Sequence, residues 1–313
     1  MTFFVLRRIG SGLALILVVV TGTFLLISLD PDAAVRNVLG EFATSEQIQR
    51  KAAELGLNEP LYVQYGQWIG NALRGDLGHS WITNAPVASA LLQRMPVSLS
   101  LVLVSTVVTA VFSIVLGLTA AIRGGASDKA VQVLAVFGFA MPNFWFALVL
   151  VSLFSITIRL FPATGFVPFT TSPTQWASSL VLPVFALAVG TIASTAQQVR
   201  AATIDVLRQD YVRTLRSRGL PSGSIVFKHV LRNAATPALT VLSLQFVGLL
   251  AGSVVIERVF AIPGVGSLVV DAALAGDAPQ VLGVVSFMVF MVVSVNFIID
   301  LLTGWLNPKV RSQ

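Results

Sequence analysis

Six long stretches of the sequence contain no charged residue, and this feature points to a membrane fold. Each stretch has at least 21 residues. A helix needs about 20 residues, at about 1.5 Å each, to cross the hydrocarbon layer of a bilayer. The uncharged stretches are Ile9–Leu29, Met95–Ile122, Ala130–Ile158, Leu160–Val199, Asn233–Ile256 and Ala278–Ile299. Because only 11% of the residues are charged, against about 25% in soluble domains, we predict an all-α integral membrane protein with six transmembrane helices.

The fourth stretch is longer than one helix needs, and prolines divide it. Its 40 residues include Pro162, Pro168 and Pro173, and a proline inside a helix removes a backbone hydrogen bond and clashes with the preceding turn. We expect a loop in the first part and a helix from about Ser179 onward. In the third stretch, Met141-Pro142-Asn143 is expected to break the span for the same reason.

Lysine and arginine are divided unequally between the two sides of these spans. Thirteen of the 20 fall on the side that holds both chain ends, and seven fall on the other side over a longer total length. Cytoplasmic loops carry an excess of basic residues, so we predict that both termini are cytoplasmic. The predicted organisation is a first transmembrane helix at 1–29, an extracytoplasmic region at 30–96 and a five-helix core at 97–313. A cytoplasmic loop is predicted at 200–235.

This chain lacks the residues that several kinds of chemistry require. The net charge of +6 does not indicate nucleic-acid binding, because the basic residues lie between apolar blocks rather than in one stripe with aromatics. Cysteine is absent, and the two histidines, His79 and His229, are predicted on opposite sides of the membrane. There is no G-x-x-x-x-G-K-S/T stretch to bind ATP phosphates. We therefore expect no catalytic residue, no metal site and no cofactor bound by this chain.

The basic loop after the fourth span carries an apolar stripe. From Ile204, apolar residues recur at steps of three and four, which is typical of one face of a helix. The stripe residues are Ile204, Leu207, Tyr211 and Leu215. Gly219 is placed to end this helix, Ser222 to cap a second short helix through Leu231, and Pro237 to begin the next span. Such a loop is either an amphipathic segment on anionic lipid or a rigid docking site for a cytoplasmic partner.

The sequence of this loop resembles the EAA loop of bacterial ABC importer permeases. The matching segments are Asp210–Gly219 and His229–Ala234. The general pattern is E-A-A, three residues and then glycine; here Arg213-Thr214-Leu215 replace E-A-A, and Gly219 is at the expected place. Arg232 replaces the proline that ends the general motif. At both of these positions the loop resembles the B subunits of dipeptide and oligopeptide permeases.

Other stretches resemble the same branch, in order along essentially the whole chain. They are Leu6–Arg8, Gly56–Leu61 with Gln64-Tyr65, Arg74–Gly78, Glu257–Phe260, Ile262–Gly266, Asp277–Pro279, Asp300–Leu302 and Asn307–Arg311. Each match alone is weak. Together, in this order and with this spacing, they identify the chain as similar to the B-subunit family of these permeases.

This resemblance implies a type I ABC importer permease fold and a place in a complex in the bacterial cytoplasmic membrane. The implied partners, besides membrane lipid, are a homologous C-type permease subunit and an extracytoplasmic substrate-binding protein. Two ATPase subunits, or one fused double ATPase, would bind ATP and Mg. The implied cargo is dipeptides or oligopeptides; nickel or haem import, and a self-sufficient secondary transporter, remain as alternatives.

In such importers the loop is a coupling helix that sits in a groove of the ATPase. The resemblance implies the same role for the residues of this loop that match the family's motif. The residues expected to couple to the ATPase are Asp210, Tyr211, Arg213, Thr214, Leu215, Arg216, Arg218 and Gly219.

Uncharged polar residues within the spans form a second candidate group. Such side chains commonly bond between packed helices; the alternative is a hydrated path for a polar, backbone-rich substrate. The glycine-rich turn at 263–266 is expected to be re-entrant on the external side, where it would help close an outer gate or meet the binding protein. The candidate path and gate residues are Asn143, Gln198, Ser243, Gln245, Pro263, Gly264 and Gly266.

Overall fold

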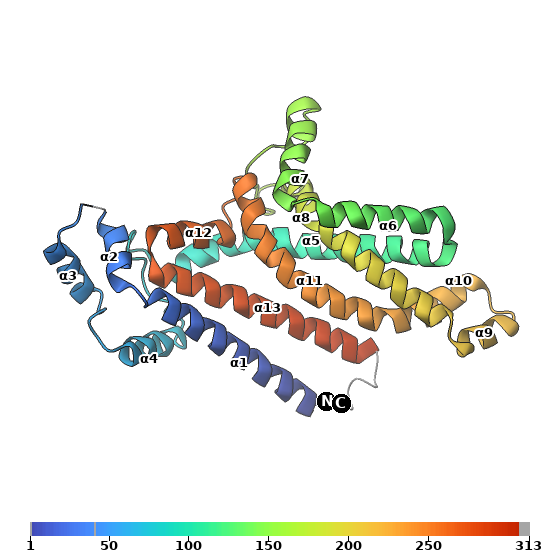
Figure 1. Ribbon diagram of the computed structural model, residues 1–313, viewed down its shortest axis with the longest axis horizontal. Coiled ribbons are helices and arrows are strands. Elements are labelled where there is room, and N and C mark those ends of the chain that lie inside the picture. Colours follow the sequence, from blue (N-terminus) through green and yellow to red (C-terminus); the bar gives the residue numbers. More distant parts are fainter. Residues whose placement is uncertain (1, 41, 307–313) are drawn as a thin grey trace. The chain divides into compact units, whose positions relative to one another are not determined.

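The computed structural model describes residues 2–40 and 42–306, and its regular elements within these ranges are helices (Figure 1). One isolated antiparallel bridge pairs His79 with Pro86. Among the described residues, five helices are long and apolar enough to cross a bilayer. They are α1 (Thr2–Ile27), α5 (Val87–Arg123), α8 (Pro173–Leu207), α11 (Leu231–Val259) and α13 (Ala278–Leu306). The C-terminal resemblance at Asn307–Arg311 lies outside the described residues.

The sixth predicted span is bent. It consists of α6 (Gly125–Ala140) and α7 (Asn143–Leu150), which continues into the π-helical segment η1 (Val151–Thr157). The two parts meet at an angle of 102°, and Figure 1 shows α7 turning steeply away from α6. Met141 is extended (φ −90°, ψ 121°), as expected for a residue before a proline. The predicted break is confirmed, and six spans are present when the bent pair counts as one.

The helix α8 begins at Pro173 rather than near Ser179. Ser172 caps it, because its hydroxyl accepts a hydrogen bond from the N–H of Gln175 at 3.4 Å. Pro173 follows directly, and the first helical position favours proline because no intrahelical partner is lost there. The expected start was therefore wrong: this proline opens the helix, and another, Pro183, is accommodated within it.

The chain divides into two compact units, which are described separately. Among the described residues, the first consists mainly of Leu99–Ile262 with 294–306, and the second consists of Leu6–Ser98 with Pro263–Val293. This division passes through α5 and α13, so it differs from the predicted segments, whose boundaries lie at the ends of spans. The membrane side of each segment stays a prediction.

In the first unit, α8 packs against α6, α7 and α11. Two glycines allow close approach to α8. A Cβ added at Gly117 in α5 would lie 2.7 Å from the backbone oxygen of Ala196. A Cβ added at Gly138 in α6 would lie 2.7 Å from the Cβ of Ala193. Small residues at these positions therefore set the short distance between the helices.

An ion pair also joins α6 to α8. The Nη2 of Arg200 donates to Oδ2 of Asp128 at 2.7 Å, and its Nε donates to the other carboxylate oxygen. Two parallel bonds of this kind fix the relative orientation of the groups as well as their distance. The pair holds the start of α6 against the end of α8 that leads into the basic loop.

In the second unit, three short helices lie in the predicted external region. They are α2 (Pro31–Leu39), α3 (Ser45–Glu54) and α4 (Leu61–Ala72). The helix α2 packs against α3 and against α12 (Val265–Ala275). A buried apolar cluster holds α12 to the starts of α5 and α13. Its buried members are Val87, Leu91, Val265, Leu268 and Val284.

Asp277 connects the loop before α5 to the start of α13 within this second unit. Its carboxylate is buried and accepts hydrogen bonds from the hydroxyl of Ser80 and from the N–H of Trp81, the latter at 3.1 Å. Hydrogen bonds to a charged group are stronger than those between neutral groups. The carboxylate therefore anchors the loop of Ser80 and Trp81 to the helix that follows Asp277.

Candidate functional site

The basic loop begins with a break between α8 and a short helix. The helix α8 ends at Leu207, Gln209 is extended (φ −70°, ψ 147°), and α9 (Asp210–Ser217) follows. In Figure 1, α9 lies beyond the end of α8, near the start of α11. The single helix predicted from Ile204 is therefore wrong, because Ile204 and Leu207 belong to the end of the span. The apolar period continues across the break, so periodicity alone did not reveal it.

An apolar cluster holds α9 in place. Val212 is fully buried, and Tyr211 and Leu215 pack against the same cluster while partly buried. The predicted stripe contained Tyr211 and Leu215 but missed Val212. The buried members of the cluster are Val206, Val212, Ile225, Val230 and Ala234. Because they come from α8, α9, the segment leading into α11 and α11 itself, the loop is a packed projection rather than a flexible tether.

Gly219 ends α9 in a left-handed conformation, with φ +76°. The N–H of Leu220 donates to the carbonyl of Leu215 at 3.3 Å, and the N–H of Gly219 donates to the carbonyl of Arg216 at 3.0 Å. These two bonds make a Schellman motif. A Cβ at Gly219 would meet nothing within 4 Å. The position therefore favours glycine for its backbone conformation and not for lack of space.

The second half of the loop is continuous with the fifth span. The short helix α10 (Ser222–Ser224) and the π-helical segment η2 (Ile225–Val230) lead without a break into α11. The predicted separate helix capped by Ser222 is therefore wrong, since Pro221 occupies the cap position and no side chain caps this end. Pro237 lies inside α11 rather than in its first turn. The sequence carries no local signal for the π-helical turn that makes the two helices continuous.

The other predicted coupling residues lie on the outer side of α9. Asp210 and Arg213 have side chains that are 97% and 76% exposed, with Oδ1 and Nη1 3.7 Å apart. Arg216 and Arg218 are exposed as well. The hydroxyl of Thr214 donates to the carbonyl of Asp210 at 3.1 Å. The helix therefore has one buried apolar side and one exposed, mainly basic side.

A residue that was not among the predicted site residues, Asn233, joins this site. Its Nδ2 donates to the hydroxyl oxygen of Tyr211 at 2.8 Å and to the carbonyl of His229 at 3.1 Å. Apolar periodicity did not mark Asn233, because it is a polar, exposed residue. Its only signal was its place in the second matching segment, His229–Ala234. The bond connects α9 directly to the beginning of α11.

Two of the polar residues that were predicted to line a path form hydrogen bonds to neighbouring spans. The hydroxyl of Ser243 donates to Oδ1 of Asn296 at 2.7 Å, and Nε2 of Gln245 donates to the hydroxyl of Ser194 at 2.7 Å. These bonds join α11 to α13 and to α8. They match the helix–helix interpretation of such residues, and a role in a path stays a prediction.

Asn143 lies where α7 meets α8 and α11. Its Oδ1 is 3.8 Å from the position of a Cβ on Gly190 in α8, and its Nδ2 is 3.6 Å from that of a Cβ on Gly252 in α11. Gln198 is exposed. The amide of Asn143 is therefore at ordinary contact distance from both positions. The closer neighbours are the carbonyl oxygen of Gly138, 3.1 Å from a Cβ on Gly190, and Cδ1 of Leu187, 3.0 Å from one on Gly252.

The glycine-rich turn lies in the second unit and leads into α12. Gly264 precedes the helix in an extended conformation, and Gly266 is buried in its first turn, with Pro263 just before. The N–H of Val265 donates to the hydroxyl of Ser98 at 2.7 Å. Protein groups therefore satisfy part of this non-helical backbone, as a re-entrant segment requires. Its role as a gate stays a prediction.

Comparison with known proteins assigns the chain to a family. Residues 113–312 match the family described as binding-protein-dependent transport system inner membrane component. Residues 1–102 match the N-terminal region described for membrane components of the same systems. The chain belongs to this family. This membership and the apolar helices together make this permease a multi-pass protein of the plasma membrane.

Individual relatives match this permease over nearly their whole lengths. A Brucella abortus protein, named provisionally as a peptide transport system permease protein, is 40% identical, with 99% of each chain covered. A di/tripeptide transport system permease protein of Pseudomonas aeruginosa is 36% identical, with 100% of each chain covered. An oligopeptide transport system permease protein of Bacillus subtilis is 32% identical, with 99% of this chain and 100% of the relative covered.

A solved structure supports the fold. A chain of the MetNI methionine ABC transporter, in an inward-facing conformation, matches with a TM-score of 0.53. The match covers 69% of this permease and 96% of that chain, at 16% sequence identity. At this identity the likeness concerns the fold alone. The predicted type I ABC importer permease fold is confirmed.

Proposed function

We propose that this permease is one membrane subunit of an ATP-driven importer for dipeptides or oligopeptides. Relatives named for di/tripeptide and oligopeptide transport cover the chain from end to end, which supports the peptide cargo. The residues that resemble the coupling loop of such importers form one continuous packed structure, which supports the mechanism.

The construction of α9 carries this proposal. Its apolar side packs into a cluster shared with the ends of α8 and α11, and its basic side is exposed. A helix that is fixed in this way passes a displacement on to the spans, whereas a flexible loop would absorb it. An ATPase docked on the exposed side could therefore shift α8 and α11 between inward-facing and outward-facing arrangements.

The remaining parts of the importer are separate proteins in this proposal. Two ATPase subunits, or one fused double ATPase, bind ATP and Mg and hydrolyse the nucleotide, so this chain is not itself an enzyme. A C-type permease subunit completes the path, and an extracytoplasmic substrate-binding protein delivers the peptide. The chain ends and the basic loop lie on the cytoplasmic side, and α2, α3 and α4 lie outside.

Single-cysteine crosslinking tests the docking site. The natural chain has no cysteine, so Arg213→Cys or Arg216→Cys introduces the only thiol. We expect either variant to crosslink to an ATPase subunit in the co-purified complex. The matched control is Glu46→Cys, at an exposed position of α3, which should give no such adduct. Adducts with lipid alone at both α9 positions would contradict the proposal.

Transport measurements test the cargo and the energy source. In proteoliposomes that contain the complex, we expect uptake of a labelled dipeptide that requires ATP and the binding protein. Preferential uptake of nickel or haem would reassign the cargo and leave the mechanism in place. Uptake by the purified chain alone, without an ATPase, would identify a secondary transporter instead.

A further inference from the structure

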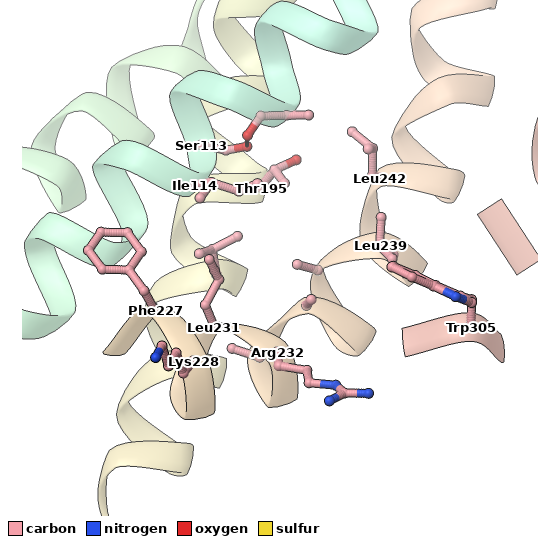
Figure 2. Close-up of a pocket in the computed structure, with 15 residues that line it drawn as sticks. Ser113, Ile114, Thr195, Phe227, Lys228, Leu231, Arg232, Leu239, Leu242 and Trp305 are labelled. Carbon is pink, nitrogen blue, oxygen red and sulfur yellow. Dashed lines mark hydrogen bonds between the residues drawn. The ribbon is translucent and has the colours of Figure 1, made fainter. Parts of the chain in front are cut away.

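A cavity of about 730 Å³ lies in the first unit beside the basic loop. Helices α5, α8, α11 and α13 and the segment η2 contribute its walls (Figure 2). Most of the lining is apolar. Its large apolar side chains are Ile114, Val199, Phe227, Leu231, Leu239 and Leu242. A wall of this kind does not hold water well, because water needs two to four polar partners.

Two cations lie together on one side of this cavity. Figure 2 shows Lys228 and Arg232 at the lower edge, on η2 and the start of α11. None of the 15 lining residues is acidic. Trp305, near the end of α13, also lines the cavity, and tryptophan is enriched at the level of lipid headgroups. The cavity therefore combines an apolar interior with a positively charged edge near the predicted cytoplasmic surface.

An unpaired hydroxyl also lines the cavity. Thr195 is 1% exposed, and its Oγ1 has no hydrogen-bond partner among the described residues. In Figure 2 it lies on the opposite side of the cavity from Lys228. Buried polar groups in native proteins are nearly always paired, so an unpaired one at a cavity wall indicates a partner from outside the chain.

We propose that this cavity binds one anionic glycerophospholipid. The phosphate would lie by Lys228 and Arg232, an ester carbonyl of the glycerol backbone would accept the hydrogen bond of Thr195, and an acyl chain would fill the apolar interior. Basic pockets between transmembrane helices on the cytoplasmic side are suited to such headgroups. A peptide fits less well, because it brings a backbone donor and acceptor with every residue and the wall offers few polar partners.

The position of the cavity gives the lipid a structural role. Phe227 and Lys228 belong to η2, and η2 packs against both α9 and α11. A bound lipid would therefore contact the segment that joins the basic loop to the fifth span. The proposal rests on the walls of this cavity and not on the cargo or on the ATPase partner.

Native mass spectrometry tests this site. The full-length permease, together with the subunits that co-purify with it, is delipidated and then titrated with lipid. We expect phosphatidylglycerol to bind more tightly than phosphatidylcholine with the same acyl chains. Lys228→Gln should weaken phosphatidylglycerol binding about fivefold, since one basic residue near an anionic surface contributes about that factor. The matched control is Lys129→Gln, at an exposed position of α6, which should leave binding unchanged.

A second pair of variants tests the hydroxyl. Thr195→Val removes the unpaired donor and should weaken binding of both lipids about fivefold, as expected for one hydrogen bond. Its control is Thr203→Val on the same helix, because the hydroxyl of Thr203 already donates to the carbonyl of Val199 at 2.7 Å. Ala238→Trp should fill the cavity and abolish binding of both lipids at this site.

Three outcomes would overturn the proposal. Equal binding of the two lipids would remove the role of the cations, and binding that survives both Lys228→Gln and Thr195→Val would place the lipid elsewhere. A photocrosslinker at Ala238 that captured the second permease subunit or a labelled peptide, and no lipid, would show another occupant. Because Lys228 is exposed, its variant should fold even if Ala238→Trp does not.

Discussion

The side-chain amide of Asn233 donates a hydrogen bond of 2.8 Å to the hydroxyl of Tyr211. This bond joins α9 to the first turn of α11, and Tyr211 also packs on the apolar cluster beneath the loop. The helix α9 is therefore connected to the fifth span by a polar bond on its outer edge and by apolar packing underneath.

Removing this bond should loosen the connection without unfolding the loop. One such bond contributes about 1 kcal/mol, so Tyr211→Phe should lower the amount of peptide transported per ATP hydrolysed about fivefold at most. The measurement is the ratio of uptake to ATP hydrolysis in proteoliposomes. Tyr62→Phe, at an exposed position of α4, is the control. An unchanged ratio in Tyr211→Phe would show that this bond carries no coupling.

Variants of Gly219 can separate the effect of its backbone conformation from the effect of steric crowding by a side chain. The left-handed conformation costs a side chain with Cβ roughly 1–2 kcal/mol, and asparagine tolerates it best. Gly219→Val should therefore lower coupled uptake about five- to thirtyfold, whereas Gly219→Asn should retain most of it, and both should insert in the membrane. The control is Gly223→Val, where φ is not positive and no atom lies within 4 Å of an added Cβ. Equal uptake by the two Gly219 variants would rule out the conformational explanation.

Asp277 should be a main source of stability for the second unit. Asp277→Ala leaves the donors of Ser80 and Trp81 without their partner, and we expect it to lower the free energy of unfolding by about 3 kcal/mol. Asp277→Asn keeps one acceptor oxygen and should cost less. Limited proteolysis of the loop at 73–86 and thermal unfolding in detergent measure the effect. Glu59→Ala, at an exposed position, should change neither, and equal stability of all three variants would contradict this role.

Gly117 should tolerate no side chain. A Cβ there would lie 2.7 Å from the carbonyl oxygen of Ala196 and 2.8 Å from the Cβ of Val199, and no rotamer change relieves a clash with backbone. Overpacking of this kind destabilises by about 1–3 kcal/mol, so Gly117→Ala should lower the melting temperature in detergent. The control is Gly10→Ala in α1, where nothing lies within 4 Å. A melting temperature as high as that of the control would mean that α5 and α8 can separate freely.

Features that depend on local sequence were predictable, and those that depend on distant residues were not. The length of the uncharged stretches predicted the spans, because a charged side chain in the hydrocarbon layer costs free energy whichever residues surround it. Glycine at position 219 was predicted to end a helix, and it does so. The start of α8 was misplaced because Pro173 has opposite effects at the first turn and inside a helix.

Bonds between distant residues left no trace in the local pattern. Asp277 and Ser80 are 197 residues apart, and Ser243 and Asn296 are 53 apart. The sequence around each of these residues does not distinguish it from any other polar residue. Only the packing of the helices brings the partners together. The cavity beside η2 is of the same kind, since its walls come from four helices and η2.

The meeting of α7, α8 and α11 has a mechanical consequence. Gly190 and Gly252 present bare backbone there, and the amide of Asn143 lies within 4 Å of the positions that their side chains would fill. Helices whose side chains interdigitate like ridges and grooves resist sliding, but a flat contact resists mainly separation. At this junction the Cδ1 of Leu187 in α8 lies 3.0 Å from the position of a Cβ on Gly252 in α11, so these two spans interlock and their contact resists sliding as well as separation.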